Sequence, residues 1–328
     1  MGFYFYDLSG GINLAESKTA TGLINKKIPW LKGENVEIYQ NRGIIRQKGN
    51  TLLCELPHNA AILGLFEVDY SGRLYLLIYT QFGELYMLNH GTGVLTCLKN
   101  DFTPSENVSF TKFLGGACIS NGIDEPVFFD PADLENPLKP TLATTADGVE
   151  IRGLAMSSYN GRLWIASGST LYYSALGRYD DWKTAGDAGY ISNFYSDYSK
   201  ITALCPYREF LAIYKNDEIY FLSGFSEEDF KVSHFANRGA DAQNGVINVN
   251  NKQYFFSKGM FNLAQVGELG QIVMSADEAQ PIKPLVEGYS KNNANKISIV
   301  SYDLKNQIWF FVPQKNSSYQ NIVWIWDY

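Results

Sequence analysis

Three short acidic clusters hold the side chains best suited to chemistry. They lie at residues 180–181, 227–229 and 277–278. Two carboxylates from different loops can cleave a glycosidic bond when they converge at roughly 5–10 Å. Each cluster, however, follows a strand-like run and falls in a predicted connecting loop, where solvated acids are normal. We therefore expect no glycosidase pair, and no cluster has the ligand spacing of a calcium loop.

Histidine and cysteine provide no catalytic or metal-binding pattern. The sequence contains no His-Glu-x-x-His motif and no Gly-x-Ser-x-Gly nucleophile elbow. No two cysteines form a Cys-x-x-Cys pair, so we expect buried free thiols in a reducing compartment. The residues concerned are His58, His90, His234, Cys54, Cys97, Cys118 and Cys205. The sequence thus predicts no enzyme activity, no metal and no cofactor.

Aromatic residues form the remaining candidate site. Tyr190, Phe194, Tyr195 and Tyr198 lie together in a long insertion between two strand-rich segments. A loop rich in tyrosine, serine and asparagine is good material for a protein interface or a sugar platform. The same aromatic side chains can instead pack the loop onto its own sheet. The sequence leaves both interpretations open.

A repeat of strand-like segments must position these residues. A turn followed by a dense aromatic or β-branched run recurs six times, starting at residues 72, 116, 161, 208, 251 and 306. The copies are 43 to 55 residues apart, and a period of about 40–50 residues is typical of one propeller blade. Most copies have a strand before the run and one or two strands after it. We predict an all-β fold, a β-propeller of about six four-stranded blades. Seven blades are the alternative if residues 1–60 form a further partial blade.

The last copy lacks a fourth strand, which leaves the predicted ring open. An N-terminal strand that completes the last blade would remove two exposed sheet edges. We assign Thr51–Leu56 to that closing strand. The expected division is an extended N-terminal arm with short strands over residues 1–50 and a β-propeller over residues 51–328.

Composition excludes some classes of function. Of the 328 residues, 45% are hydrophobic and 19% charged, which is ordinary for a globular protein, and the net charge is −7. A sequence-specific DNA binder needs cations against phosphate, so this balance argues against one. A channel wall that DNA slides past would tolerate it. The sequence has no apolar run of about 18 residues, so we expect no membrane anchor.

Several motifs resemble one family of phage proteins. They include LSGGIN at 8–13, RGIIRQKGN at 42–50, YNGRLW at 159–164, YFFSKGMF at 254–261 and VWIWDY at 323–328. In these motifs the chain resembles the tail hub, or tail nozzle, proteins of short-tailed bacteriophages, also called packaged-DNA stabilisation proteins. The resemblance is spread over most of the chain.

The resemblance implies a non-enzymatic structural protein of the virion. Such a protein forms a ring, commonly a hexamer, below the portal and adaptor of the phage. The ring extends the DNA channel and helps retain packaged DNA until ejection. The expected partners are further copies of the chain, the portal and adaptor, tail spike, fibre or needle proteins, and DNA that passes without sequence-specific contacts. Assembly would take place in the bacterial host cytoplasm. The alternative function is a carbohydrate-binding or glycan-processing β-propeller.

Overall fold

Left-handed turn residues fix the hairpins from which the fold is built. In the turn between Tyr159 and Arg162, both Asn160 and Gly161 have positive φ, at 47° and 71°. Two successive left-handed residues match the right-handed twist of the flanking strands, which favours a tight antiparallel hairpin. Ser71 and Gly72 repeat this conformation in the first blade. These turns are where the sequence repeat predicted them.

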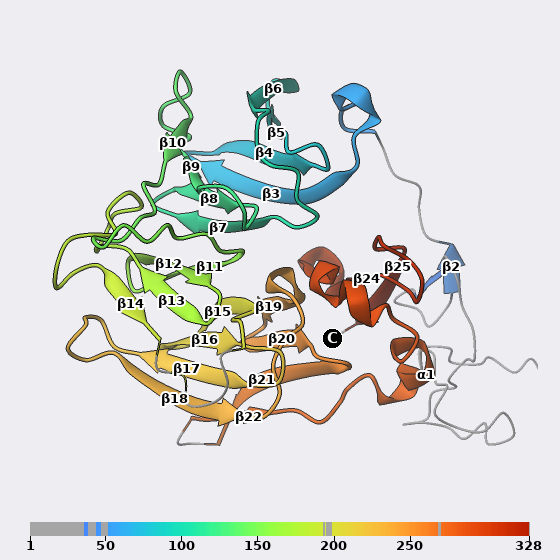
Figure 1. Cartoon of the computed structure of the whole chain (residues 1–328). Helices are drawn as coiled ribbons and strands as arrows, with labels where there is room; N and C mark the ends of the chain where they lie inside the picture. The colour runs from blue at the N-terminus through green and yellow to red at the C-terminus, as the bar shows by residue number, and fades with distance from the viewer. Residues whose placement is uncertain are drawn as a thin grey trace, which may run out of the picture.

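The computed structural model describes residues 36–38, 44–46, 52–192, 194, 199–267 and 270–327. In this part of the chain, six antiparallel sheets follow one another around a common axis (Figure 1). The predicted fold class, a six-bladed β-propeller, is therefore confirmed. Five blades have four strands and the last has three.

The strands of the first three blades are β3 (Ile62–Tyr70), β4 (Arg73–Thr80), β5 (Leu85–Asn89) and β6 (Val94–Lys99); β7 (Ser109–Phe113), β8 (Gly116–Ser120), β9 (Val127–Phe129) and β10 (Leu138–Pro140); and β11 (Ala155–Tyr159), β12 (Arg162–Ser167), β13 (Thr170–Tyr173) and β14 (Gly189–Ile191). Those of the last three are β15 (Ala203–Tyr207), β16 (Phe210–Tyr214), β17 (Ile219–Ser223) and β18 (Lys231–Ala236); β19 (Val246–Val249), β20 (Lys252–Phe256), β21 (Met260–Val266) and β22 (Gln271–Met274); and β23 (Ser298–Tyr302), β24 (Gln307–Val312) and β25 (Ile322–Asp327).

Helical structure is confined to short turns. They are η1 (Pro57–Asn59), η2 (Gln243–Gly245), η3 (Gln280–Ile282), α1 (Lys283–Val286), η4 (Lys291–Lys296) and η5 (Asp303–Lys305). None of the helices in the described residues is long and apolar enough to cross a membrane.

The core consists of apolar layers between neighbouring blades. Successive blades share a buried cluster at five junctions, from blades 1 and 2 through to blades 5 and 6. At the junction of blades 3 and 4, Trp164 packs with Leu211 and Tyr220 in one cluster. Burial of these layers is the main force that stacks the sheets. No cluster of the described residues joins blade 6 to blade 1. An ion pair of 3.0 Å between Lys296 and Glu106 connects the last blade to the loop between blades 1 and 2.

The predicted closing strand is not found in the described residues. Residues 52–56 form no strand, and Thr51 lies outside the described part. Instead, Cys54 and Leu56 pack against a buried cluster on the first blade that includes Ile78 and Tyr86. The apolar run was misread as a strand because it covers a sheet face, where apolar residues are also needed.

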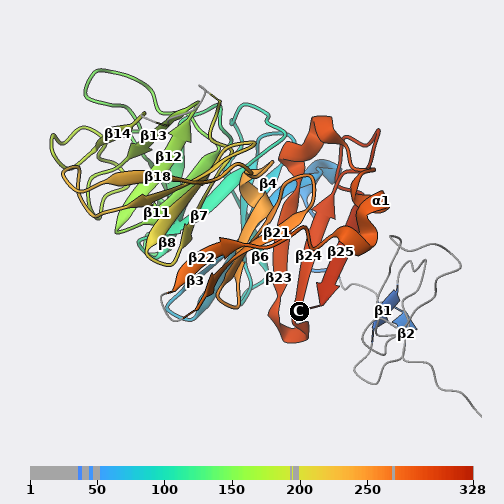
Figure 2. The same cartoon turned by 90° about the horizontal axis from the view of Figure 1, so that it is seen from below.

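Short strands also form upstream of the propeller. β1 (Val36–Ile38) and β2 (Ile44–Arg46) pair with each other and with no blade. Both views show this pair outside the ring of blades, on the side of α1 and β25 (Figures 1 and 2). Residues 1–35 of the predicted arm lie outside the described residues.

Candidate functional site

The axis of the propeller is the usual place to search for a site in such a fold. The first strands of successive blades lie next to one another around it, and η2 contacts β15 and β23 there. Gln243 accepts a hydrogen bond from the Leu204 N–H at 2.8 Å and donates to the carbonyls of Leu204 and Met156. Asn244 donates to the Val108 carbonyl at 3.1 Å. The polar groups of η2 thus bridge blades 2, 3 and 4, and they satisfy strand backbone rather than face an open tunnel.

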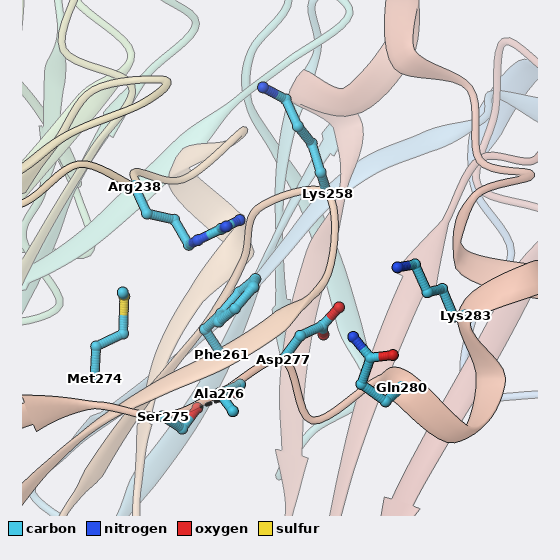
Figure 3. Close-up of a pocket in the computed structure, with 9 residues that line it drawn as sticks. All are labelled: Arg238, Lys258, Phe261, Met274, Ser275, Ala276, Asp277, Gln280 and Lys283. Atoms are coloured by element: carbon cyan, nitrogen blue, oxygen red, sulfur yellow. Dashed lines mark hydrogen bonds between the residues drawn. The ribbon is translucent and has the colours of Figure 1, made fainter. Parts of the chain in front are cut away.

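A pocket opens on one end of blades 4 and 5, next to the segment that leads into blade 6. Figure 3 shows the side chains that line it, among them Arg238, Lys258, Phe261, Asp277 and Lys283. They come from the loop after β18, the β20–β21 hairpin, β21, the loop after β22, and α1. Three segments of the chain therefore bring cations to one opening.

The Arg238 guanidinium lies over the Phe261 ring, 4.2 Å from its centroid, and donates to the Ser257 carbonyl at 3.2 Å. This stacking holds the cation in place and leaves other N–H donors available. Among the described residues, neither Arg238 nor Lys283 has an ion-pair partner. The pocket accordingly suits a carboxylate or phosphate group.

Acidic groups limit that positive charge. Lys258 pairs with Asp217 at 3.0 Å. The Asp277 carboxylate accepts backbone N–H groups of Met260 and Ala279, at 3.1 and 3.0 Å. Burial raises the pKa of Asp241, whose carboxylate accepts a hydrogen bond from the Lys258 N–H at 3.4 Å. The pocket is therefore of mixed charge rather than strongly basic.

The acidic clusters considered from sequence are not brought together. Asp181 accepts hydrogen bonds from Thr184, and Asp229 accepts from Ser226, so each carboxylate holds its own turn. Hydrogen bonding lowers the pKa of both groups. These turns follow the third strands of blades 3 and 4. Asp277 follows the fourth strand of blade 5, at the opposite end of its antiparallel sheet. The arrangement provides no pair of carboxylates facing one cleft.

The aromatic insertion divides into two environments. Tyr190 lies on β14, is 60% exposed, and stands beside Tyr172 with ring centroids 5.9 Å apart. Phe194 is only 8% exposed and packs edge-on against Tyr220 between blades 3 and 4. Packing within the fold, not surface contact, is thus the role of Phe194. Tyr195 and Tyr198 lie outside the described residues.

Cysteine burial was predicted only in part. All four cysteines are free; Cys118 is buried, Cys54 and Cys205 are partly buried, and Cys97 is exposed. Cys97 lies on β6, the outermost strand of the first blade, where alternate side chains face solvent. The described residues contain no group of His, Cys, Asp and Glu side chains that could hold a metal ion.

The residues that the structure brings together were largely missed from sequence. Arg238, Gln243 and Asn244 all lie in the polar connection between β18 and β19, without a motif around them. The only sequence signal was their position between the fourth strand of one blade and the first strand of the next. In a propeller, such a connection returns from the rim to the axis.

Comparisons with known proteins agree on the fold and go no further. No family model matches the chain, and no curated protein matches it. The extracellular domain of a putative one-component system from B. thetaiotaomicron is similar over 84% of this chain and 34% of that chain, with 10% identity and a TM-score of 0.53. A similarity at this identity shows a shared propeller fold alone.

Two further solved structures have lower scores. PorZ, a surface component of the type-IX secretion system of Porphyromonas gingivalis, matches over 81% of this chain and 31% of that chain, with 16% identity and a TM-score of 0.46. The computationally designed protein Ika8 matches over 82% of this chain and 72% of its own length, with 10% identity and a TM-score of 0.48. The chain thus spans about one third of the length of PorZ and of the B. thetaiotaomicron protein.

Proposed function

We propose that this protein is a non-enzymatic subunit of a phage virion, a tail hub or nozzle protein. In this proposal, copies of the chain form a ring below the portal and adaptor. The ring extends the DNA channel and helps retain packaged DNA until ejection. The motif resemblance named above is the starting point.

One observation carries the proposal beyond resemblance. The polar side chains at the axis, where a propeller would most readily hold a ligand, bind strand backbone of neighbouring blades. The acids at 181 and 229 are likewise bound within their own turns. Polar groups that are hydrogen-bonded in this way stabilise the propeller and are not free to perform chemistry. This supports a structural role.

The same geometry bears on the path of DNA. Because η2 bridges the axis of the propeller, DNA would pass between subunits, through the centre of the ring that they form. A chain with a net charge of −7 would contribute few cations to that wall. Weak counterion release would keep DNA mobile in the channel.

A ring requires two different surfaces on each subunit, because its contacts are head-to-tail. Tyr190 provides one candidate, an exposed aromatic side chain on the outermost strand of blade 3. Exposed tyrosines are common anchors in protein interfaces. We assign Tyr190 to the contact between subunits or to the contact with the adaptor.

The test is the mass of the assembly. Light scattering of the purified chain, alone and with purified portal and adaptor, should show a ring in the mixture at least. Tyr190→Arg should reduce ring formation at least tenfold. Leu304→Arg, at an even more exposed apolar position on η5, should leave it unchanged. A chain that stays monomeric beside portal and adaptor would contradict the proposal.

A further inference from the structure

The pocket that Arg238 and Lys283 line is a cavity with no role in the proposed assembly. Its volume is about 600 Å³, within the range of roughly 300–1,000 Å³ that is usual for small-molecule sites. Its side chains come from the β18–β19 connection, the β20–β21 hairpin, β21, β22 with the loop after it, and α1 (Figure 3). We call this cavity the blade 5 pocket. The chemistry of its lining determines which class of ligand fits.

Arg238 provides a cation that is already held in place. Its guanidinium lies over the Phe261 ring, 4.2 Å from the ring centroid, and donates to the Ser257 carbonyl at 3.2 Å. Phe261 is itself buried and stacks on Phe255, with ring centroids 5.8 Å apart. A guanidinium has five N–H donors in a rigid fork, so donors remain for a ligand. Such a fork binds a carboxylate through two parallel hydrogen bonds.

Lys283 brings a second cation to the same opening from another part of the chain. It is exposed on α1, whose Val286 is buried in the apolar cluster that blades 5 and 6 share. The helix is therefore anchored while the Lys283 side chain faces the pocket. Figure 3 shows Arg238 and Lys283 reaching the pocket from opposite sides, with Asp277 between them.

These two cations outnumber the acids that face them, since neither has an ion-pair partner in the part of the chain that the structure describes. Lys258 pairs with Asp217 at 3.0 Å, so these two charges offset each other. Asp277, whose carboxylate accepts two backbone N–H groups, contributes one negative charge. Asp241 lies outside the lining, and its burial disfavours the charged form. The small positive excess suits a monoanion such as a carboxylate better than a phosphate, which carries about −1.5 to −2 at pH 7.

The lining also includes apolar side chains. Met274 at the end of β22 and Ala276 in the loop that follows contribute to the pocket together with the Phe261 ring (Figure 3). Methionine adapts its flexible side chain to irregular apolar shapes. A bare carboxylate would fill only a small part of a cavity of about 600 Å³. The ligand therefore needs a body of its own, and these side chains favour an apolar one.

We propose that the blade 5 pocket binds a small monocarboxylate with an apolar body, of the class of arylacetates and short fatty acids. The Arg238 fork holds the carboxylate, and Lys283 adds positive charge from across the pocket. The apolar body lies against Met274 and Ala276. The neutral amide of the same molecule lacks the charge that these cations select, and phosphate lacks the apolar body. This inference does not depend on the proposed function.

Calorimetric titration of the full-length chain with small probes tests the ligand class. Phenylacetate and hexanoate should each bind saturably, with one molecule per chain. Phenylacetamide lacks the charge, acetate lacks the apolar body, and inorganic phosphate differs in both respects. Each of these three should bind at least tenfold more weakly than phenylacetate. Absence of saturable binding by both phenylacetate and hexanoate would overturn the proposal, and so would phenylacetamide or phosphate binding as tightly as phenylacetate.

Three variants locate the bound carboxylate. Arg238→Gln should weaken phenylacetate binding at least tenfold, although it also removes the contact with Phe261. Lys283→Gln and Ala276→Trp are at exposed positions, where substitution leaves the fold intact. Lys283→Gln should weaken binding at least threefold. Ala276→Trp retains every charge and should abolish binding, because the indole fills the space of the apolar body.

A matched control separates a built site from general attraction to surface charge. Lys252→Gln removes an exposed lysine at the other end of β20 from the pocket and should leave the affinity for phenylacetate unchanged. Equal losses in K252Q and K283Q would show diffuse attraction and overturn the proposal. Wild-type affinity in both K283Q and A276W would place the carboxylate elsewhere and would overturn it as well.

Discussion

At the scale of single residues, Asp241 is the clearest case of a carboxyl group whose burial disfavours its charged form. It lies in the loop from blade 4 to blade 5, where its backbone N–H donates to the Phe256 carbonyl at 3.2 Å. Burial raises its pKa, and the nearby Asp217 carboxylate raises it further, while the Lys258 N–H and charge oppose the shift. An acid with a raised pKa in the folded state binds its proton more tightly when folded than when unfolded.

Asp241→Asn should therefore increase stability at neutral pH. The protonated acid of the wild type contributes stability below the pKa of the unfolded chain, about 3.9 for aspartate. That contribution is lost as the pH rises through the raised folded pKa. The neutral amide avoids the loss, so urea unfolding should show the variant more stable at pH 7 and nearly equal to wild type at pH 3.

Asp229→Asn provides a control of opposite sign. Backbone N–H groups of Phe225 and Ser226 bind the Asp229 carboxylate and lower its pKa. Its contribution is present above the pKa of the unfolded chain and is lost as the pH falls through the folded pKa. This variant should lose stability at pH 7 and approach wild type at low pH. A D241N variant with the same pH dependence as D229N would contradict the assignment of burial as the cause.

At the scale of elements, a tight turn depends on close backbone approach as well as on φ. Gly83, in the turn between β4 and β5, has φ at +75°, and a Cβ there would lie 2.2 Å from the Phe102 carbonyl oxygen. Gly72, between β3 and β4, has the same φ with nothing within 4 Å of a Cβ. A comparison of alanine substitutions at these two glycines therefore separates the cost of backbone strain from the cost of a steric clash.

Gly72→Ala should cost about 1 kcal/mol, the strain of a left-handed alanine. Gly83→Ala should cost about 2–4 kcal/mol, because the backbone must also move away from Phe102. Chemical denaturation of both variants provides the comparison. Equal losses would show that the Phe102 contact relaxes freely.

The elements were predicted well from sequence where a repeat supplied the signal. Turns at 72, 161 and 208 recur at blade spacing, and each contains a residue with positive φ. Residues 52–56 were misassigned because an apolar run that covers a sheet face resembles a strand. Pattern alone does not distinguish main-chain pairing from side-chain packing. Phe194 presents the same difficulty, since an aromatic residue in a loop can serve either the core or the surface.

The candidate sites were beyond the reach of sequence for a different reason. Asn244 bonds to the Val108 carbonyl across 136 residues of chain, and Gln243 reaches Met156 across 87. A contact between a side chain and a distant backbone leaves no periodicity and no motif. The pocket depends in the same way on Arg238 stacking on Phe261. Such sites follow from how the blades are placed around the axis.

At the scale of the whole molecule, the propeller is not equally held at all six junctions. Blade 4 shares buried clusters with blades 3 and 5, whereas blade 6 shares one with blade 5 alone among the described residues. Because blade stability comes mainly from these layers, the last blade should open more easily than blade 4.

Ile213 and Ile308 allow a matched test of this asymmetry. Both isoleucines are fully buried on the second strand of a blade, Ile213 in blade 4 and Ile308 in blade 6. Either substitution to alanine removes the same atoms and should cost about 2–5 kcal/mol locally. Ile308→Ala should let blade 6 open as a separate unit, since among the described residues it shares a buried cluster with blade 5 alone. Ile213→Ala should instead lower the stability of the whole ring, because blade 4 cannot open without disrupting two junctions.

Hydrogen exchange followed by mass spectrometry distinguishes the two outcomes. In the Ile308→Ala variant, amide exchange in β23–β25 should become at least tenfold faster, while peptides from β11 to β17 keep their wild-type rates. In the Ile213→Ala variant, exchange should accelerate in all blades together. Local opening reports a cooperative unit smaller than the domain. If Ile308→Ala accelerated exchange throughout the ring, the last blade would be as tightly coupled as the others, and the propeller would be held closed at all six junctions.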